Sequence, residues 1–465
     1  MRTVEVSAAP LAALAAELDE VAARRLTAGA ERARRLLAGR TVWNVSAAEG
    51  GGVGELLRTM LPYARDGGVD ARWLVLDGDA EFFRIAARLH AVMHADPGDG
   101  GELGPEEMAH YDRVLGANLE EVRESVASGD VVLLHDPATA GLAPGLHRRG
   151  ARVVWRCHVG TDAPDGILDR AWAFLEPAVA QADRVVLSRP TYRPGFLEAE
   201  AVRVIAPSVD PLSPKNRRLE PAEVARLLTD AGLAGGASAP GTAGDGADRP
   251  AEPADGAMRA GGSVPAGART VLQVSRWDRL KDMSGLLIAF AEGFEELPED
   301  VHLLLAGAAV APHDSAAAEV LDGCLEIWQG LEPEVRGRAH VACLPTADRD
   351  HNALLVNALQ RHAAVVVQKS LAEGFGLTVT EALWKGRPVV ATAVGGIQDQ
   401  ITDGTNGLLV PDPTDLHGVI TCVARLLAEP AFAERLGEAA HDRVRREFLS
   451  DRHLLQYVDL VDELL

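Results

Sequence analysis

Short apolar runs alternate with helical stretches twice along this chain, and this alternation restricts the fold more than any other feature of the sequence. In the first half the runs are TVWNVSA, ARWLVLDG, DVVLLHD, ARVVWRCHV, DRVVLS and VRVIAPSVD. In the second half they are TVLQVSRWD, VHLLLAG, HVACLP, AAVVVQKS, RPVVATAV and GLLVPD. Runs that are apolar on both faces and separated by helices are typical of a parallel sheet covered on both sides. The sequence therefore predicts an α/β protein with two Rossmann-like, doubly wound domains whose strand ends face an interdomain cleft.

Length and local composition indicate where these domains begin and end. A chain of 465 residues is too long for one ordinary hydrophobic core. Residues 231–268 consist largely of Ala, Gly and Pro without any aromatic residue, so this segment cannot bury enough surface to become ordered. The expected division is a helical arm at 1–40, a Rossmann-like domain at 41–220, a disordered insertion at 231–268, a second Rossmann-like domain at 269–445 and a helix at 446–465 that packs back on the N-terminal domain.

Charge and cysteine usage exclude several classes of protein. The net charge of −22 repels polyanions, so nucleic acid is not an expected partner. The four cysteines have neither the spacing of a zinc site nor that of a disulfide framework, which favours a reducing cytoplasm. No stretch approaches the roughly 20 apolar residues that cross a bilayer. We therefore expect a soluble cytoplasmic protein without a membrane partner; its oligomeric state is open, a homodimer included.

The most informative segment is SLAEGFGLTVTEALWKGRPVVATAV, residues 370–394. It predicts a strand end, a glycine loop, a helix that begins near Leu377 or Thr378, and a further strand. Gly374 and Gly376 let the backbone approach a ligand closely. The unpaired N–H groups and the positive end of the helix dipole would face the same place, which favours a phosphate group. The hydroxyl of Thr378 adds a further donor.

Two carboxylates, Glu373 and Glu381, flank this loop with seven residues between them. Carboxylates repel phosphate but accept hydrogen bonds from sugar hydroxyls, so the pair is suited to a sugar attached to the phosphate. The alternative interpretation makes Glu381 an acid in the first turn of the helix, where it favours the dipole, and Glu373 a solvated loop charge.

The segment EGFGLTVTEALWKG resembles the E-x7-E signature of the retaining glycosyltransferases with the GT-B fold. The resemblance implies that Glu373 binds the hydroxyls of the donor hexose and Glu381 those of the ribose. It further implies that the backbone amides of the loop bind the sugar and that the helix start lies beside the diphosphate; these residues are Gly374, Phe375, Gly376, Leu377 and Thr378.

Two cations, Arg276 and Lys281, follow a predicted strand in VLQVSRWDRLKD. Sugar transfer builds negative charge on the leaving phosphate oxygen, and fixed cations stabilise that charge more in the transition state than in the ground state. The resembled family uses an Arg and a Lys here in place of a metal, and no D-x-D metal motif is evident in the region that matches the metal-dependent sugar transferases. Mg²⁺ is compatible with the donor but has no dedicated site. The alternative for Arg276 is a surface ion pair.

The first domain contributes a glycine loop and two histidines. Gly51, Gly52 and Val53 follow the first strand and precede a helix expected near Glu55, where a glycine loop lets donor phosphate and acceptor approach; the alternative is a plain turn. His135 and His158 end two strands, and His158 resembles the family's histidine that touches the donor sugar, although strand-end histidines are often structural. The lesser candidates are Arg156, Arg189 and Lys215.

Three segments, APSVDPLSPKN, SRWDRLKD and QKSLAEGFGLTVTEALWKG, narrow the resemblance to the glycosyl-transferring trehalose synthases and the related trehalose phosphorylases. It covers about 41–220 and 269–450, and it makes the N-terminal domain the acceptor domain and the C-terminal domain the nucleotide-sugar domain. It implies transfer of glucose from ADP-, UDP- or GDP-glucose to glucose, without a tightly bound cofactor. The chain departs from the pattern at Ala138 and Gly160, both on the acceptor side. The alternatives are a phosphorylase, a transferase with another small acceptor, and a non-catalytic nucleotide-sugar binding protein.

Overall fold

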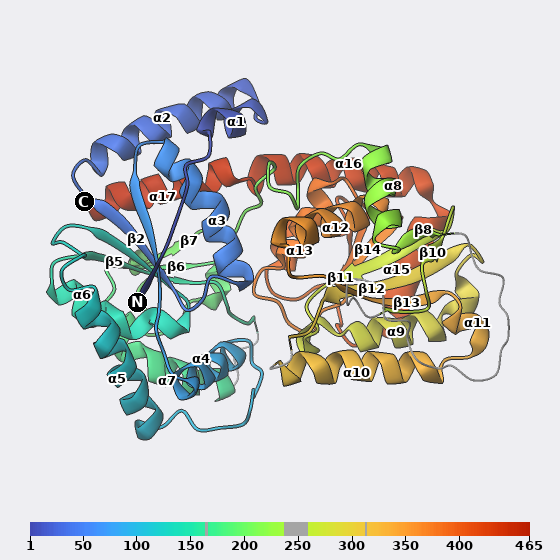
Figure 1. Ribbon diagram of the computed structural model, residues 1–465, viewed down its shortest axis with the longest axis horizontal. Coiled ribbons are helices and arrows are strands. Elements are labelled where there is room, and N and C mark those ends of the chain that lie inside the picture. Colours follow the sequence, from blue (N-terminus) through green and yellow to red (C-terminus); the bar gives the residue numbers. More distant parts are fainter. Residues whose placement is uncertain (163–165, 237–258, 312–313) are drawn as a thin grey trace. The chain divides into compact units, whose positions relative to one another are not determined.

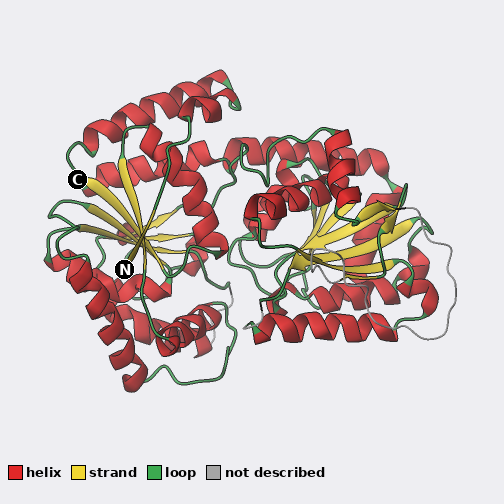
Figure 2. Ribbon diagram, in the orientation of Figure 1, coloured by secondary structure: helices red, strands yellow, loops and turns green. Residues whose placement is uncertain are grey.

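The computed structural model describes residues 1–162, 166–236, 259–311 and 314–465 (Figure 1). These residues form two compact units. The first unit comprises Met1–Pro211, Glu373–Phe375 and Glu447–Leu465, and the second comprises Leu212–Ala372 and Gly376–Arg446. In each unit helices cover both faces of a central sheet, which confirms the predicted doubly wound architecture (Figure 2).

The first unit has a seven-stranded sheet in the order β1-β3-β2-β4-β5-β6-β7. Its strands are β1 (Arg2–Val4), β2 (Thr41–Ser46), β3 (Asp70–Val75), β4 (Val131–His135), β5 (Arg152–Cys157), β6 (Arg184–Leu187) and β7 (Val202–Val204). All neighbours are parallel except β1, which pairs antiparallel with β3 and was not anticipated in the predicted helical arm. The strand order reverses between β2 and β4, and the carboxyl ends on either side of such a point are where ligands bind in these sheets.

Helices cover the two faces of this sheet. They are α1 (Leu11–Ala16), α2 (Glu20–Leu36), α3 (Gly51–Asp66), α4 (Ala80–Met93), α5 (Pro105–Glu121), α6 (Ala143–Arg148), α7 (Gly166–Val179) and α17 (Ser450–Leu464). Val132 and Leu134 of β4 enter the core on the side of α4, α5 and α7, whereas Val131 and Leu133 enter a second cluster that includes α17. This alternation along one strand explains why the run DVVLLHD is apolar throughout.

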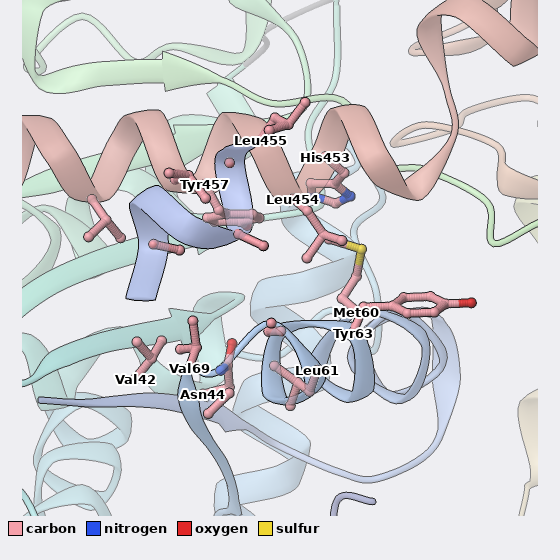
Figure 3. A pocket seen from close by; sticks show the side chains of 18 of the residues that line it. Val42, Asn44, Met60, Leu61, Tyr63, Val69, His453, Leu454, Leu455 and Tyr457 are labelled. Carbon is pink, nitrogen blue, oxygen red and sulfur yellow. The ribbon is translucent and has the colours of Figure 1, made fainter. Parts of the chain in front are cut away.

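A cavity of about 130 Å³ lies on the α17 side of this sheet (Figure 3). Apolar side chains of α2, α3 and α17 line most of it, and Met60 and Tyr457 are among them. Asn44 and His453 add polar groups to its wall, and His453 Nδ1 lies 2.8 Å from Ser208 Oγ. Because Asn44 also contacts His135, the cavity borders the histidine pair described below.

The second unit has a seven-stranded sheet in the order β16-β15-β14-β11-β12-β13-β9. Its strands are β9 (Arg259–Ala260), β11 (Arg269–Val274), β12 (Val301–Ala308), β13 (Ala339–Leu344), β14 (Val365–Gln368), β15 (Val389–Thr392) and β16 (Leu408–Val410). Apart from the edge strand β9, all neighbouring strands of this sheet are parallel and follow the Rossmann order. The order reverses between β11 and β14. The predicted cations follow β11 and the predicted glycine loop follows β14, so both belong to this reversal point.

The helices of the second unit cover its sheet in the same manner. They are α8 (Pro221–Asp230), α9 (Met283–Glu292), α10 (Ser315–Gly330), α11 (Pro333–Arg336), α12 (Arg349–His362), α13 (Leu377–Trp384), α14 (Ile397–Gln400), α15 (Leu416–Ala428) and α16 (Pro430–Glu447). Across the described ranges, no single helix has the length and apolar character needed to cross a membrane; α15 and α16 meet that criterion only jointly, as a pair bent by 103°.

The ends of the predicted insertion carry regular structure. β8 (Ala234–Gly236) pairs with β10 (Val264–Pro265), and β9 adds an antiparallel edge strand to β13. Leu233 and Val264 are buried, so apolar side chains at these ends anchor the backbone although Ala, Gly and Pro surround them. The expectation of disorder is therefore wrong for 231–236 and 259–268. Its remaining part, 237–258, lies outside the described residues.

Candidate active site

The two predicted cations lie at the carboxyl end of β11. Arg276 begins the loop that follows the strand; its side chain is 68% exposed and forms an ion pair with Asp278 at 2.8 Å. Lys281 ends a single 3-10 turn, Arg279–Lys281, directly before α9. An exposed guanidinium and an ammonium group thus lie on the same loop at this strand end, where both carry positive charge.

The start of α13 has the geometry of a phosphate site. Gly376 has φ +86° and precedes the helix, which begins at Leu377 as predicted. A Cβ at Gly376 would lie 3.1 Å from Ile397 Cγ1 and would also be strained at this φ, so glycine is required. The first N–H groups of a helix have no partner within it, and those of Leu377 and Thr378 lie at this end. The dipole and these amides favour an anion there.

Glu381 lies in the second turn of α13, not in the first turn as expected, because the helix begins at Leu377. The residue is buried, and Lys215 Nζ lies 3.6 Å from its Oε1 atom. Lys385 Nζ donates to the Glu381 carbonyl oxygen at 3.1 Å and to Asn216 Oδ1 at 3.0 Å. Lys215, a lesser candidate by sequence, is thus a cation beside this carboxylate.

The loop Glu373–Phe375 packs within the first unit although its neighbours in sequence belong to the second. The Tyr192 hydroxyl contacts the carbonyl oxygens of Gly374 at 2.8 Å and Glu373 at 3.1 Å. A Cβ at Gly374 would lie 2.8 Å from the His158 carbonyl oxygen, so only glycine fits. The structure therefore brings together His158, Glu373 and Gly374, and the ring of Phe375 lies 5.8 Å from that of Phe448.

Tyr192 is a site residue that sequence reasoning missed. Its ring also explains the glycine that departs from the expected pattern, since a Cβ at Gly160 would lie 2.3 Å from Tyr192 Cδ2. The acidic side chain near this position is that of Asp162, which pairs with Arg189 and accepts a hydrogen bond from Thr191 Oγ1 at 2.9 Å. No spacing in the sequence connects Tyr192 with Glu373, so no local signal could have identified it.

His135 and His158 stack at the carboxyl ends of β4 and β5, with ring centroids 5.5 Å apart. His135 Nδ1 lies 3.2 Å from His158 Nε2, and His135 Nε2 lies 3.1 Å from Asn44 Oδ1. The amide oxygen can only accept, so it fixes the proton of His135 on Nε2 and leaves Nδ1 to accept from His158. Between the strands, Asp136 has φ +64° and accepts from the His158 N–H at 2.7 Å. This strained residue fixes the backbone of His158.

Burial determines the charge of these groups. Desolvation, assisted by the Arg156 charge, lowers the pKa of His135 to about 3 and lowers that of His158 well below its usual 6.5. The same burial raises the pKa of Asp136 to about 6. The hydrogen bond from the His158 N–H and the charge of Arg156 lower this pKa, but burial has the larger effect. Both imidazoles are neutral at pH 7 and act as hydrogen-bonding groups. Arg156 itself is fully buried and donates to the Leu187 carbonyl oxygen at 3.2 Å, which is a structural role.

We expect His135 and His158, net of Asp136, to contribute a fall of about 2 kcal/mol in the free energy of unfolding between pH 7 and pH 5, in addition to the fall that the other buried histidines contribute. Below pH 6.5 the unfolded chain protonates His135 and His158 while the folded chain does not, so the unfolded state binds more protons and gains stability. Below about pH 6 the folded chain protonates Asp136 while the unfolded chain does not, which raises the free energy of unfolding. This gain offsets the loss from only one of the two histidines. Urea unfolding at both pH values measures the change, and His135→Gln should reduce the pH dependence. The same pH dependence in His135→Gln as in the parent would contradict the neutral histidine pair.

The glycine loop of the first unit lies at the carboxyl end of β2. Gly51 has φ +73°, which favours glycine, and a Cβ at Gly51 or Gly52 would meet no atom within 4 Å. Helix α3 begins at Gly51, so the expected start near Glu55 is wrong: the glycines form the first turn, and Val53 lies within it. The loop therefore leaves open space in front of a helix N-terminus, as a bound group requires.

The predicted site residues thus fall into two groups. The first unit holds the glycine loop Gly51–Val53, His158 and Glu373–Phe375, and the second holds Arg276, Lys281, Gly376–Thr378 and Glu381. Ala138, the other departure, is buried in the turn after β4. In the part of the chain that the structure describes, no three His, Cys, Asp or Glu side chains are grouped to hold a metal ion.

Two Rossmann-type units, with a glycine loop and helix start after β14 and paired cations after β11, define a glycosyltransferase of the GT-B class. Solved structures share this fold: sucrose-phosphate synthase from Thermosynechococcus elongatus has a TM-score of 0.64 at 19% identity and covers 91% of this chain and 99% of its own. The structure described as trehalose-6-phosphate from E. coli bound with UDP-2-fluoro glucose has a TM-score of 0.69 at 13% identity. The match covers 91% of this chain and 99% of that chain.

Sequence comparison identifies the family. Residues 44–194 match the model of the trehalose synthase N-terminal domain, and residues 257–443 match that of the group 1 glycosyl transferases. The trehalose synthase of Pyrococcus horikoshii is 32% identical over 93% of this chain and 92% of its own length. The trehalose synthase of Rubrobacter xylanophilus is 33% identical over 94% of this chain and 93% of its own length. The chain belongs to the trehalose synthase family of glycosyltransferases.

Proposed function

We propose that the protein transfers glucose from a nucleoside diphosphate glucose to the anomeric hydroxyl of a second glucose, with retention of configuration, and so forms trehalose. The observation that carries this proposal is the position of Arg276 and Lys281 after β11 and of the start of α13 after β14, the two paired strands at which the order of the second sheet reverses. Full-length relatives named trehalose synthase support glucose as the acceptor, and the E. coli neighbour solved with UDP-2-fluoro glucose supports a nucleotide-sugar donor.

The residues suggest how the reaction proceeds. The bond between the anomeric carbon and the phosphate oxygen breaks while the acceptor oxygen bonds to the same face of that carbon. Charge that builds on the leaving phosphate is stabilised by Arg276, Lys281 and the amides of α13. The leaving phosphate oxygen takes the acceptor proton, so the protein needs no nucleophile. Glu373 and Glu381 serve as acceptors for sugar hydroxyls and not as an acid and base pair.

A phosphorylase that replaces the nucleotide by inorganic phosphate remains the second candidate, because the same amides and cations would hold that phosphate. Trehalose phosphorylase from Grifola frondosa is 23% identical over 86% of this chain, but the match spans only 54% of that protein. The trehalose synthases match over nearly their whole length at higher identity. This difference favours a nucleotide-sugar donor.

Product analysis tests the proposal. The protein is incubated with glucose and either ADP-, UDP- or GDP-glucose or glucose 1-phosphate, and the products are separated by chromatography. We expect trehalose and a nucleoside diphosphate with at least one nucleotide donor. Trehalose formed only from glucose 1-phosphate would support the phosphorylase. If the protein transferred glucose from a nucleotide donor to other sugars but not to glucose, the proposed acceptor would be wrong while the proposed donor would stand. Repeating the reaction with EDTA determines whether Mg²⁺ assists the donor.

A further inference from the structure

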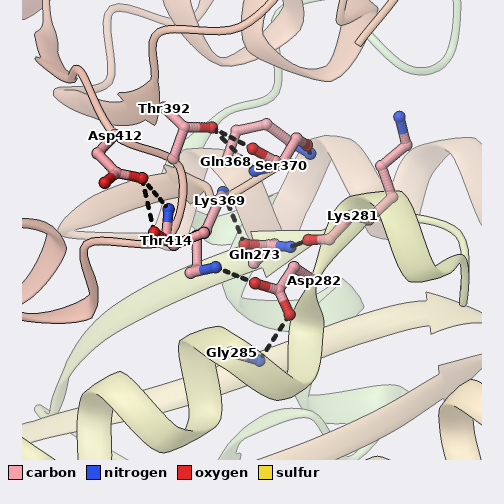
Figure 4. Close-up of polar contacts among 10 residues, drawn as sticks. All are labelled: Gln273, Lys281, Asp282, Gly285, Gln368, Lys369, Ser370, Thr392, Asp412 and Thr414. Carbon is pink, nitrogen blue, oxygen red and sulfur yellow. Dashed lines mark hydrogen bonds and ion pairs between the residues drawn. The ribbon is translucent and has the colours of Figure 1, made fainter. Parts of the chain in front are cut away.

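A lysine lies almost completely buried beneath the loop that carries Lys281. Lys369 follows β14, and its side chain is 1% exposed. Its ammonium group forms an ion pair with Asp282, which directly follows Lys281 (Figure 4). A buried ammonium group costs several kcal/mol in desolvation, and a hydrophobic residue of the same size would often serve stability as well or better. The pair therefore calls for a reason other than stability.

Asp282 has an unusual backbone conformation. Its φ and ψ are +45° and +48°, in the left-handed region where residues other than glycine are uncommon. Its carboxylate accepts from the Gly285 N–H at 3.0 Å and so caps α9. A Cβ at Gly285 would lie 2.3 Å from that carboxylate, so the glycine leaves room for it. Such a conformation persists where surrounding contacts determine it, and the cap and the Lys369 ion pair supply those contacts.

A second buried side chain joins the same two strand ends. Gln273 of β11 donates through Nε2 to the Lys281 carbonyl oxygen at 2.7 Å, and its Oε1 accepts from the Lys369 N–H at 3.1 Å. The backbone of Lys281 is thus held on one side by Gln273 and on the other by Asp282. Figure 4 shows that the Lys281 side chain points away from these contacts.

We propose that Lys369, acting with Asp282 and Gln273, is a positioning residue that fixes the backbone of Lys281 so that its ammonium group meets the leaving phosphate. This inference rests on the proposed function for the role of Lys281. With the backbone already fixed, only the side chain must be ordered when the donor binds, and a placement error of about 1 Å at such a site lowers the rate by about 100-fold.

The test uses Lys369→Met, Asp282→Asn and the double variant in the full chain. Asp282→Asn takes the ion-pair partner from the buried Lys369 ammonium, and Lys369→Met takes it from the partly exposed Asp282 carboxylate, so both should lose stability, the first more than the second; the double variant removes both charges. Asparagine keeps the cap and tolerates the left-handed conformation. We expect the urea midpoint of the double variant to return toward that of the parent while its kcat stays at least tenfold lower. Amide exchange across residues 276–282 of the ligand-free protein should also be faster.

The outcomes separate positioning from stability. A double variant with parental stability, a kcat within twofold of the parent and unchanged exchange over 276–282 would overturn the proposal. If the double variant does not fold, Gln273→Met, which removes both amide bonds and no charge, gives the same readouts. If the parent transfers no sugar, the proposed function fails, and the exchange over 276–282 still decides whether Lys369 holds the loop.

Discussion

Replacing Arg276 or Lys281 by alanine is expected to lower kcat for glucosyl transfer by about 100- to 1000-fold, the loss typical of removing one group that stabilises charge in a transition state. The KM for the donor should rise much less, because these cations act mainly on charge that develops as the bond to the anomeric carbon breaks. Arg276 is largely exposed and forms an ion pair with neighbouring Asp278, so Arg276→Ala should leave the urea midpoint nearly unchanged.

Arg279→Ala is the matched control, because Arg279 lies in the same 3-10 turn as Lys281 and its removal changes the net charge equally. We expect this control to retain kcat within about twofold, because Arg279 is exposed and the proposed mechanism assigns it no contact with the leaving phosphate. Steady-state rates at saturating donor and acceptor make the comparison. If Arg276→Ala or Lys281→Ala stayed within a few-fold of the parent, or if Arg279→Ala lost as much, the assignment of these cations to the leaving phosphate would be wrong.

Features that depend on neighbours in sequence could be predicted from the sequence. The alternation of apolar runs predicted the two doubly wound sheets because each buried parallel strand must be apolar on both faces. The start of α13 at Leu377 was predicted because Gly376, with φ +86°, adopts a conformation that glycine tolerates. The start of α3 was misplaced because Gly51 and Gly52 are poor helix formers that nevertheless form its first turn.

Features that depend on residues far apart in the chain could not be predicted. Lys369 and Asp282 are separated by 87 positions, and each alone is a charged residue next to an expected site, without any sign that Lys369 is buried and pairs with Asp282. Tyr192 and Gly374 are separated by 182 positions. The ring of Tyr192 also accounts for Gly160, whose departure from the family pattern had no explanation in the sequence. The strand β1 has three residues, too few to show a periodicity.

Substitutions of Glu373 and Glu381 should affect the binding of different parts of the donor. Glu381→Gln is expected to weaken binding of the nucleoside diphosphate product by about tenfold, because a charged hydrogen bond contributes about 1.5–3 kcal/mol and Glu381 is assigned to the ribose. Glu373→Gln should leave that affinity unchanged and lower kcat/KM for the nucleotide sugar by about 100-fold, because Glu373 is assigned to the hexose. Calorimetry with the diphosphate and initial rates with the sugar nucleotide separate these effects.

The glutamine substitutions are informative because they preserve shape while removing charge. In Glu381→Gln the Lys215 ammonium loses a carboxylate at 3.6 Å, so Lys215→Met in the same background provides the control for the loss of this ion pair. If Lys215→Met restored diphosphate affinity in the Glu381→Gln background, the loss would stem from the lysine and not from the ribose. Glu373 is held through its backbone by Tyr192, so Tyr192→Phe should lower kcat/KM in the same direction as Glu373→Gln but by less. An equal loss of diphosphate affinity in both glutamate variants would contradict the division of the donor between them.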